Sequence, residues 1–167
     1  QIRTTIAYNN QKVVIVGAHA GLSVGPDGGT HQAVEDIALM RVMPNMTVLS
    51  PCDAREAYLM TRLAHDIDGP VYIRLAREKS PVIFSDEYKK IDTKSPVVVF
   101  ASPEPHAKKV CIFVTGPIIY EALLAARELE KKDIQVAVVN LSVIKPLPDE
   151  AIVRFASQYK NIITLEE

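Results

Sequence analysis

Short apolar runs rich in β-branched residues alternate, along the first part of the chain, with stretches of helical periodicity. The runs predict strands at residues 13–16, 46–49 and 71–75, and the periodic stretches predict helices at 31–42 and 53–65. Strands that alternate with helices require a parallel sheet built by right-handed crossovers. The first run is continuously β-branched, which is typical of a strand buried on both faces of such a sheet.

Local signals mark the ends of both predicted helices. Thr30 is placed to cap the first helix, and Pro44 ends it. Asp53 and Glu56 have the spacing of a capping box, in which the first side chain accepts from a first-turn amide and the second reaches back. The second helix is therefore expected to begin at Asp53.

A second group of elements follows a proline-rich segment. Strands are predicted at residues 110–114, 136–140 and 162–165, and helices at 118–131 and 149–156. Residues 79–108 contain four prolines and one strand-like run at 97–100, a texture typical of a linker. We interpret residues 1–78 and 109–167 as parts of two α/β units. Each has about three strands where a mean sheet has about five to six, so both units are expected to be incomplete. The predicted fold class is α/β, a parallel-sheet three-layer sandwich.

Composition excludes several classes of protein. The chain has 167 residues and a formal net charge of −1, without the basic excess of a nucleic-acid-binding protein. No apolar run approaches the roughly 20 residues that span a bilayer, and the first residues have no signal-peptide features. Cys52 and Cys111 lack metal-ligand spacing and indicate free thiols in a reducing compartment. We expect a soluble, cytoplasmic protein with no nucleic-acid or membrane partner.

The glycines are concentrated in one segment. Five of the seven fall within thirteen consecutive residues: Gly17, Gly21, Gly25, Gly28 and Gly29. They lie in the glycine loop, residues 17–31, which follows the first predicted strand. Ligands bind at the carboxyl ends of parallel strands. This edge is expected to collect five side chains from the loop and from the end of the third strand: His19, Asp27, His31, Arg74 and Arg77.

Two of these side chains suggest a site for an anion. His31 is expected in the first turn of a helix, where the dipole would lower its pKa and keep the imidazole neutral. The same helix end would favour an anionic ligand. Arg77 supplies a forked donor suited to phosphate.

Each side chain also has a simpler interpretation. His19 and His31 could be structural or solvated, Asp27 could be a turn residue, and the two arginines could be surface or ion-paired groups. The loop lacks the G-x-G-x-x-G spacing of a dinucleotide site, and the histidines have no metal-ligand companions.

Taken together, however, the residues form a long ordered series that resembles the pyrimidine-binding domain of transketolase. The series comprises Gly17-Ala18-His19-Ala20-Gly21, Gly25-Pro26-Asp27-Gly28-Gly29-Thr30-His31-Gln32, Glu35-Asp36-Ile37-Ala38, Arg41, Pro44-Asn45-Met46 and Gly69-Pro70-Val71-Tyr72-Ile73-Arg74-Leu75-Ala76-Arg77. The later segments resemble the start of the family's C-terminal domain: Thr115-Gly116-Pro117, Val139-Asn140-Leu141 and Ile144-Lys145-Pro146. The chain looks like the C-terminal subunit of a split transketolase.

The resemblance implies transfer of a two-carbon ketol unit between sugar phosphates, as in the pentose phosphate pathway. His19 matches the histidine that contacts the reacting region of the donor, and His31 matches a histidine in the substrate channel. Asp27 matches the aspartate that recognises a substrate hydroxyl, and Arg77 matches the arginine that binds the sugar phosphate. His19 and His31 are thus the candidate catalytic residues, and Asp27 and Arg77 the candidate substrate-binding residues.

The resemblance also implies thiamine diphosphate, held with Mg²⁺ by a diphosphate-binding domain or partner chain, in a homodimer or heterotetramer. The family's catalytic glutamate and ring-cradling aromatic residues lie upstream of the matched region. Glu35 and Glu56 are not substitutes, because both fall on helices after the loop. We therefore expect activity only with missing upstream residues and a diphosphate-binding partner.

Two alternatives stay open. One is another thiamine enzyme, such as deoxyxylulose-phosphate synthase, although its relatives usually have Asp-Arg-Ala-Gly where this chain has Ala18-His19-Ala20-Gly21. The other is a non-catalytic fragment or assembly module, which the absence of the glutamate motif favours.

Overall fold

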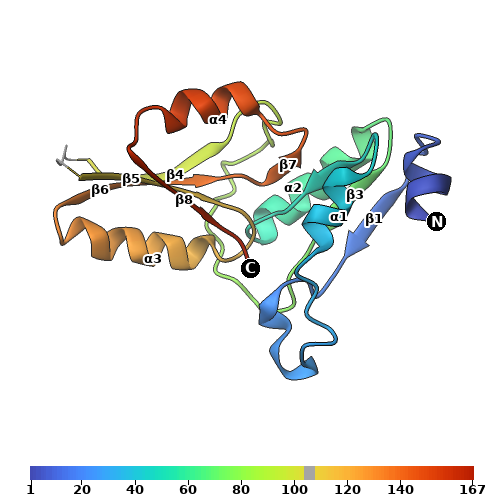
Figure 1. The fold of residues 1–167 in the computed structure, drawn as a ribbon, viewed down its shortest axis with the longest axis horizontal. Coiled ribbons are helices and arrows are strands. Elements are labelled where there is room, and N and C mark those ends of the chain that lie inside the picture. The colour runs from blue at the N-terminus through green and yellow to red at the C-terminus, as the bar shows by residue number, and fades with distance from the viewer. Residues whose placement is uncertain (104–107) are drawn as a thin grey trace.

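The structure is a computed structural model that describes residues 1–103 and 108–167 (Figure 1). It contains two four-stranded sheets, with strand orders β1-β3-β2-β7 and β4-β6-β5-β8. Both sheets are mostly parallel, and each has one antiparallel pair at an edge, β2 with β7 and β4 with β6. The α/β fold class predicted from the sequence is confirmed.

The first sheet joins strands β1 (Val14–Gly17), β2 (Thr47–Leu49), β3 (Val71–Arg74) and β7 (Val143–Lys145). Alternate residues of the central strands point to opposite faces, so Val48 and Tyr72 pack with helix α1, and Leu49 and Ile73 pack with helix α2. The result is a three-layer arrangement with β3, buried at every position, in its centre.

Strand β1 differs from its prediction. It pairs only with β3, and Val14 and Val16 are 43% and 53% exposed. These two valines share a face with Val71 and Ile73 through the parallel register, but the cluster that α2 covers does not extend to them. The expectation of a strand buried on both faces is therefore wrong.

Helix α1 spans Asp36–Val42, and the prediction that it begins at His31 is wrong. Ala33 forms an isolated bridge with Ala20, which holds this part of the chain against the glycine loop and out of the helix. Thr30 is consequently not the N-cap; Glu35 is, without a side-chain capping bond. The loop itself contains an unpredicted 3-10 helix, η2 (Leu22–Asp27), which is kinked at the non-helical Gly25. A short π-helix, η1 (Ile2–Ala7), precedes β1.

Helix α2 (Ala54–Asp66) begins as predicted. The Asp53 carboxylate accepts a hydrogen bond from the Glu56 amide at 2.8 Å. In a regular capping box the Glu56 carboxylate would accept from the Asp53 amide. Here it accepts instead from the amide of the preceding residue, Cys52, at 3.0 Å.

The second sheet joins β4 (Val97–Ala101), β5 (Lys108–Val114), β6 (Ile134–Asn140) and β8 (Asn161–Leu165). Helices α3 (Ile119–Glu130) and α4 (Asp149–Ala156) cover opposite faces of it (Figure 1). These elements match the predicted ones closely. Both cysteines are free thiols, as expected, and the structure buries them.

Strand β7 was not predicted, and it connects the two sheets. It follows β6 in the chain, yet it pairs antiparallel with β2 of the first sheet, with Leu49 opposite Val143. The segment interpreted as a linker is also anchored: Ile91 is 5% exposed in the core below α2, and residues 97–101 form β4. Residues 104–107 of that segment lie outside the described residues.

Candidate functional site

The glycine loop starts at the carboxyl end of β1 and runs beside the end of β3. The Ala20 amide donates to the Leu75 carbonyl at 3.1 Å, so the loop continues along β3 beyond the last strand pair. Gly17 is required by packing, because a Cβ there would collide with the Tyr72 hydroxyl. Gly21 is required twice, by its φ of 84° and by the Glu167 side chain that occupies the position of a Cβ.

Asp27 and Arg77 are brought together. Arg77 Nη1 donates to the Val24 carbonyl at 2.7 Å and lies 3.8 Å from Asp27 Oδ1. The Arg77 side chain is 34% exposed and the Asp27 side chain is 40% exposed, so the ion pair is solvated and weak. Within the described residues only Nη1 of the guanidinium has a hydrogen-bond or ion-pair partner. The arrangement presents a cation and an acceptor side by side at the loop's end.

His19 and His31 are exposed and stand apart from that pair. His19 has a φ of 61°, a left-handed conformation that is uncommon for residues other than glycine but enriched for histidine, asparagine and aspartate. His31 Nδ1 lies 3.0 Å from the Thr30 hydroxyl. Across the described residues no hydrogen bond or ion pair joins either histidine to Asp27 or Arg77. Because α1 begins at Asp36, the helix-dipole argument for His31 does not apply, and the anion site predicted at that helix end is not formed there.

Arg74, the fifth residue predicted at this edge, is buried and bound to other groups of the protein. It is 3% exposed; its Nε lies 3.1 Å from Asp36 Oδ2, and its Nη2 donates to the Glu167 carbonyl at 2.7 Å. The Tyr72 hydroxyl donates to the same Asp36 carboxylate at 2.7 Å, and burial raises the pKa of that tyrosine. Arg74 is therefore an internal tie between the sheets, which agrees with the ion-paired interpretation.

Sequence reasoning missed the role of Glu56. Its side chain is completely buried, and three groups donate to its carboxylate: the Cys52 amide at 3.0 Å, Asn140 Nδ2 at 3.0 Å and the Ser142 hydroxyl at 2.9 Å. Burial raises the pKa of Glu56, and these donors oppose the rise. Burial also raises the pKa of the Cys52 thiol, with the Glu56 charge adding to the effect. The capping-box spacing indicates where the helix starts. No local sequence signal indicates that the Glu56 carboxylate contacts Asn140 and Ser142, which are far away in the sequence.

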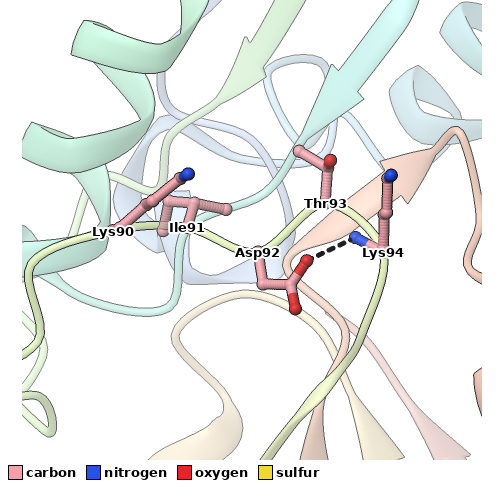
Figure 2. Close-up of a pocket in the computed structure, with 5 residues that line it drawn as sticks. All are labelled: Lys90, Ile91, Asp92, Thr93 and Lys94. Carbon is pink, nitrogen blue, oxygen red and sulfur yellow. Dashed lines mark hydrogen bonds between the residues drawn. The ribbon is translucent and has the colours of Figure 1, made fainter.

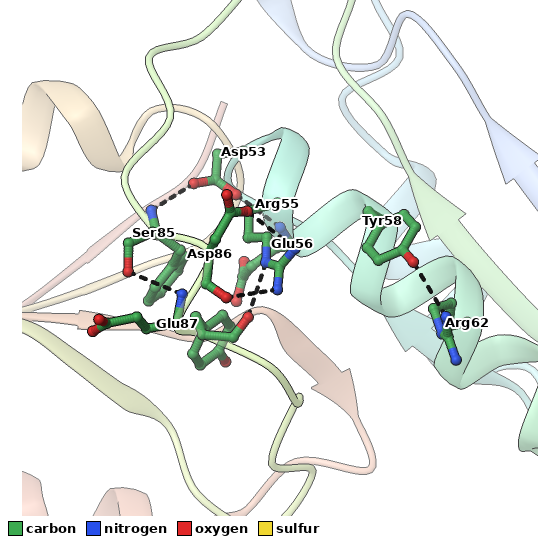
Figure 3. A network of polar contacts seen from close by, with 10 residues as sticks. Asp53, Arg55, Glu56, Tyr58, Arg62, Ser85, Asp86 and Glu87 are labelled. Carbon is green, nitrogen blue, oxygen red and sulfur yellow. Dashed lines mark hydrogen bonds and ion pairs between the residues drawn. The ribbon is translucent and has the colours of Figure 1, made fainter.

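Asp53, beside Glu56, ties the linker segment to α2. Its Oδ2 accepts from the Ile83 and Phe84 amides at 2.7 and 2.9 Å, while Oδ1 caps the helix. Figure 3 shows Asp53 and Glu56 among the polar contacts at this end of α2, with Arg55 reaching the segment around Asp86.

Two hollows of the described surface are lined by residues other than the predicted site residues. One of 490 Å³ is lined by five consecutive residues, Lys90 to Lys94, and in it Asp92 accepts from the Lys94 amide at 2.8 Å (Figure 2). Another of 370 Å³ lies where β2 and β3 end, and its lining includes Pro51, Leu75 and Pro117. His19, Asp27, His31 and Arg77 line neither.

Two negative findings apply to the described ranges, 1–103 and 108–167. No three His, Cys, Asp or Glu side chains there are grouped so that they could hold a metal ion. None of the helices there has the length and apolar character needed to cross a membrane.

Comparisons with known proteins are consistent along the whole chain. The family model described as transketolase, pyrimidine binding domain, matches residues 1–82, and the model described as transketolase, C-terminal domain, matches residues 101–167. The chain is 33% identical over 168 residues to an apulose-4-phosphate transketolase subunit of Phocaeicola vulgatus, covering 100% of this chain and 52% of that protein. It is 37% identical over 168 residues to the 6-deoxy-6-sulfo-D-fructose transketolase subunit SqwH of a Clostridium species, covering 99% of this chain and 50% of that protein.

A solved structure described as a split gene transketolase, inactive beta4 tetramer, has the same fold. The match has a TM-score of 0.84 and 35% sequence identity, and it covers 99% of this chain and 51% of that one. This chain thus spans about half the length of each of these three relatives.

Proposed function

Because the chain belongs to the transketolase family, we propose that it is the substrate-side part of a split transketolase. The proposed reaction transfers a two-carbon ketol unit between sugar phosphates, in company with a diphosphate-binding subunit. Relatives described as transketolase subunits and as a split gene product support the division between two chains.

The observation that carries the proposal is the position of Arg77 beside Asp27 at the end of the glycine loop. A guanidinium binds phosphate through paired N–H donors, and a carboxylate accepts from a sugar hydroxyl. Their separation of 3.8 Å with about a third of each side chain exposed lets a sugar phosphate engage both without breaking a buried pair.

The two histidines have the complementary proposed role. An imidazole titrates near neutral pH and is suited to hydrogen-bonding a hydroxyl or carbonyl and to moving a proton. We assign His19 to the reacting end of the donor and His31 to the channel. Both are exposed at the same loop, and among the described residues the Thr30 contact of His31 is the only hydrogen bond that either side chain makes.

The family implies thiamine diphosphate, but the described residues do not form a site for it. Their two buried carboxylates, Asp53 and Glu56, are committed to protein amides and side chains, and no metal-binding group is present in the described ranges. We place the cofactor's diphosphate and Mg²⁺ on the partner.

The sugar is defined here only by class. Two relatives are named for apulose-4-phosphate and for 6-deoxy-6-sulfo-D-fructose. Each of these sugars carries an anionic group, a phosphate in the first and a sulfo group in the second. Arg77 suits either anion, so we propose a ketose or aldose with a terminal anionic group.

Reconstitution tests the proposal. The full-length protein is co-purified with a diphosphate-binding transketolase subunit, and ketol transfer is measured with thiamine diphosphate and Mg²⁺. Turnover of the pair and none by either protein alone supports the proposal. Absence of turnover by the pair, when it assembles and binds the cofactor, contradicts it and favours an assembly module. Formation of deoxyxylulose phosphate in place of ketol transfer would identify the synthase alternative, which His19 argues against.

A further inference from the structure

The end of the second sheet reaches into the glycine loop of the first. Two residues beyond β8, Glu167 lies against the start of η2, far from it in sequence but adjacent in space (Figure 1). The Ser23 hydroxyl donates to Glu167 Oε1 at 2.5 Å, and the Ser23 amide is 3.4 Å from the same oxygen. One carboxylate oxygen therefore receives two donors from the first turn of η2.

The backbone of Glu167 is itself held from both units. The Thr115 amide donates to the Leu165 carbonyl at 3.1 Å, which fixes the end of β8 to the end of β5. Arg74 donates to the Glu167 carbonyl at 2.7 Å while its Nε is paired with Asp36. Because these anchors fix the main chain, little conformational freedom is lost when the Glu167 side chain binds Ser23.

The loop is shaped to receive this side chain. Gly21 is buried, and its missing Cβ leaves the space that the Glu167 methylene and carboxylate fill. The Val24 carbonyl, next to Ser23, accepts a hydrogen bond from Arg77 Nη1. Asp27 is the last residue of η2, and its Oδ1 lies 3.8 Å from the same nitrogen. Ser23, held by Glu167, is thus the direct neighbour of the residue whose carbonyl holds Arg77, whereas Asp27 lies beyond a kink in η2 at Gly25.

We infer that Glu167 is a positioning residue for the substrate-side loop: by holding Ser23 it fixes the adjacent Val24 carbonyl, which accepts from Arg77 and so places that guanidinium. The inference rests on the proposed function for its consequence in binding, whereas the contact itself belongs to the described structure. It gives the second unit a role in substrate recognition.

The first test is the mobility of the loop, which requires no turnover. Amide hydrogen exchange is compared in the full chain and in Glu167→Ala, with the neighbouring exposed residue changed in the matched control Glu166→Ala. Faster exchange at residues 20–27 in Glu167→Ala, with α2 unchanged and the control like the parent, supports the inference. Unchanged exchange in the loop, or equal loosening by Glu166→Ala, overturns it.

The second test is a split between binding and turnover in the reconstituted enzyme. Loss of a hydrogen bond to a charged group predicts that Glu167→Ala raises the KM for a phosphorylated acceptor about tenfold, with kcat within about twofold. Glu167→Gln keeps an acceptor oxygen and should recover most of the KM. Ser23→Ala should add little in the Glu167→Ala background, because both changes remove the same contact.

A fall in kcat with KM unchanged, or effects of Ser23→Ala and Glu167→Ala that multiply in full, would overturn the inference. If the parent pair shows no turnover at all, the proposed function fails, and loop exchange alone then decides whether Glu167 holds η2.

Discussion

The Glu56 carboxylate accepts a hydrogen bond from the Ser142 hydroxyl at 2.9 Å, and this contact joins the first turn of α2 to the connection between β6 and β7. Asn140 donates to the same oxygen at 3.0 Å. Since β7 then enters the first sheet beside β2, the buried carboxylate lies where the chain crosses from one sheet to the other.

Removing this carboxylate is expected to destabilise the protein strongly. Glu56→Ala leaves the Cys52 amide and the Asn140 and Ser142 side chains without their acceptor, which predicts a loss of about 3 kcal/mol in the free energy of unfolding. Urea denaturation measures it. The control is Glu121→Ala in the first turn of α3, an exposed residue for which a change within about 0.5 kcal/mol is expected. Equal losses in the two variants would contradict the assigned role.

Stability should also depend on pH through Glu56. Burial raises its pKa in the folded state above the usual 4.5, so the folded protein binds this proton more tightly than the unfolded chain. The stabilisation linked to protonation is complete below pH 4.5 and is lost as the pH rises through the folded-state pKa. Cys52 and Tyr88, which face the same carboxylate, have raised pKa values and stay neutral, and Asp53 is the remaining nearby charge.

The measurement is the free energy of unfolding of the parent and of Glu56→Gln from about pH 4 to about pH 8. The advantage of the parent over the variant should shrink as pH rises, because glutamine bears no charge to desolvate. A difference that is constant or grows with pH would show that the folded-state pKa is not raised.

Asp53 is expected to hold the linker segment as well as the helix. Asp53→Ala removes the cap of α2 and the acceptor for the Ile83 and Phe84 amides, for an expected loss of about 2 kcal/mol. Limited proteolysis should then cut near residues 81–87 faster than in the parent. Asp68→Ala, which removes only an exposed pair with Lys12, serves as control, and the same cleavage rate in both variants would refute the anchor.

The buried pair of Arg74 and Asp36 should respond differently from an exposed one. Arg74→Ala leaves the Asp36 carboxylate largely buried without its cation and frees the Glu167 carbonyl, which predicts a loss of about 3 kcal/mol. Lys12→Ala breaks a solvated pair, and a change within about 0.5 kcal/mol is expected. Denaturant titration measures the free energy of unfolding of both variants. Equal losses of this free energy in the two variants would contradict the assigned role of the buried pair.

Much of the fold could be predicted because its signals are local. The capping residue Asp53, the helical periodicity of α3 and the apolar runs of β3 and β6 each specify their element without help from distant residues. The failures are non-local. Strand β7 has three residues and pairs with β2, far away in sequence, and the start of α1 is delayed by the contact of Ala33 with Ala20.

The candidate site shows the same division. Parallel topology alone predicted that the glycine loop and the end of β3 would meet, and it correctly brought Asp27 to Arg77. It could not distinguish Arg77 from Arg74, because only the packing of Asp36 and Glu167 buries one arginine and leaves the other partly exposed. Nor could it find Glu56, whose partners come from the other sheet.

The most direct test of the substrate-side assignment is the KM of the reconstituted enzyme for a phosphorylated and an unphosphorylated form of one sugar. Arg77→Ala should raise the KM for the phosphorylated form about tenfold or more and leave that for the unphosphorylated form nearly unchanged. Arg62→Ala, an exposed arginine of α2 beside Tyr58, should change neither. Equal losses on both sugars, or none on either, would contradict the role of Arg77 and the substrate site built around it.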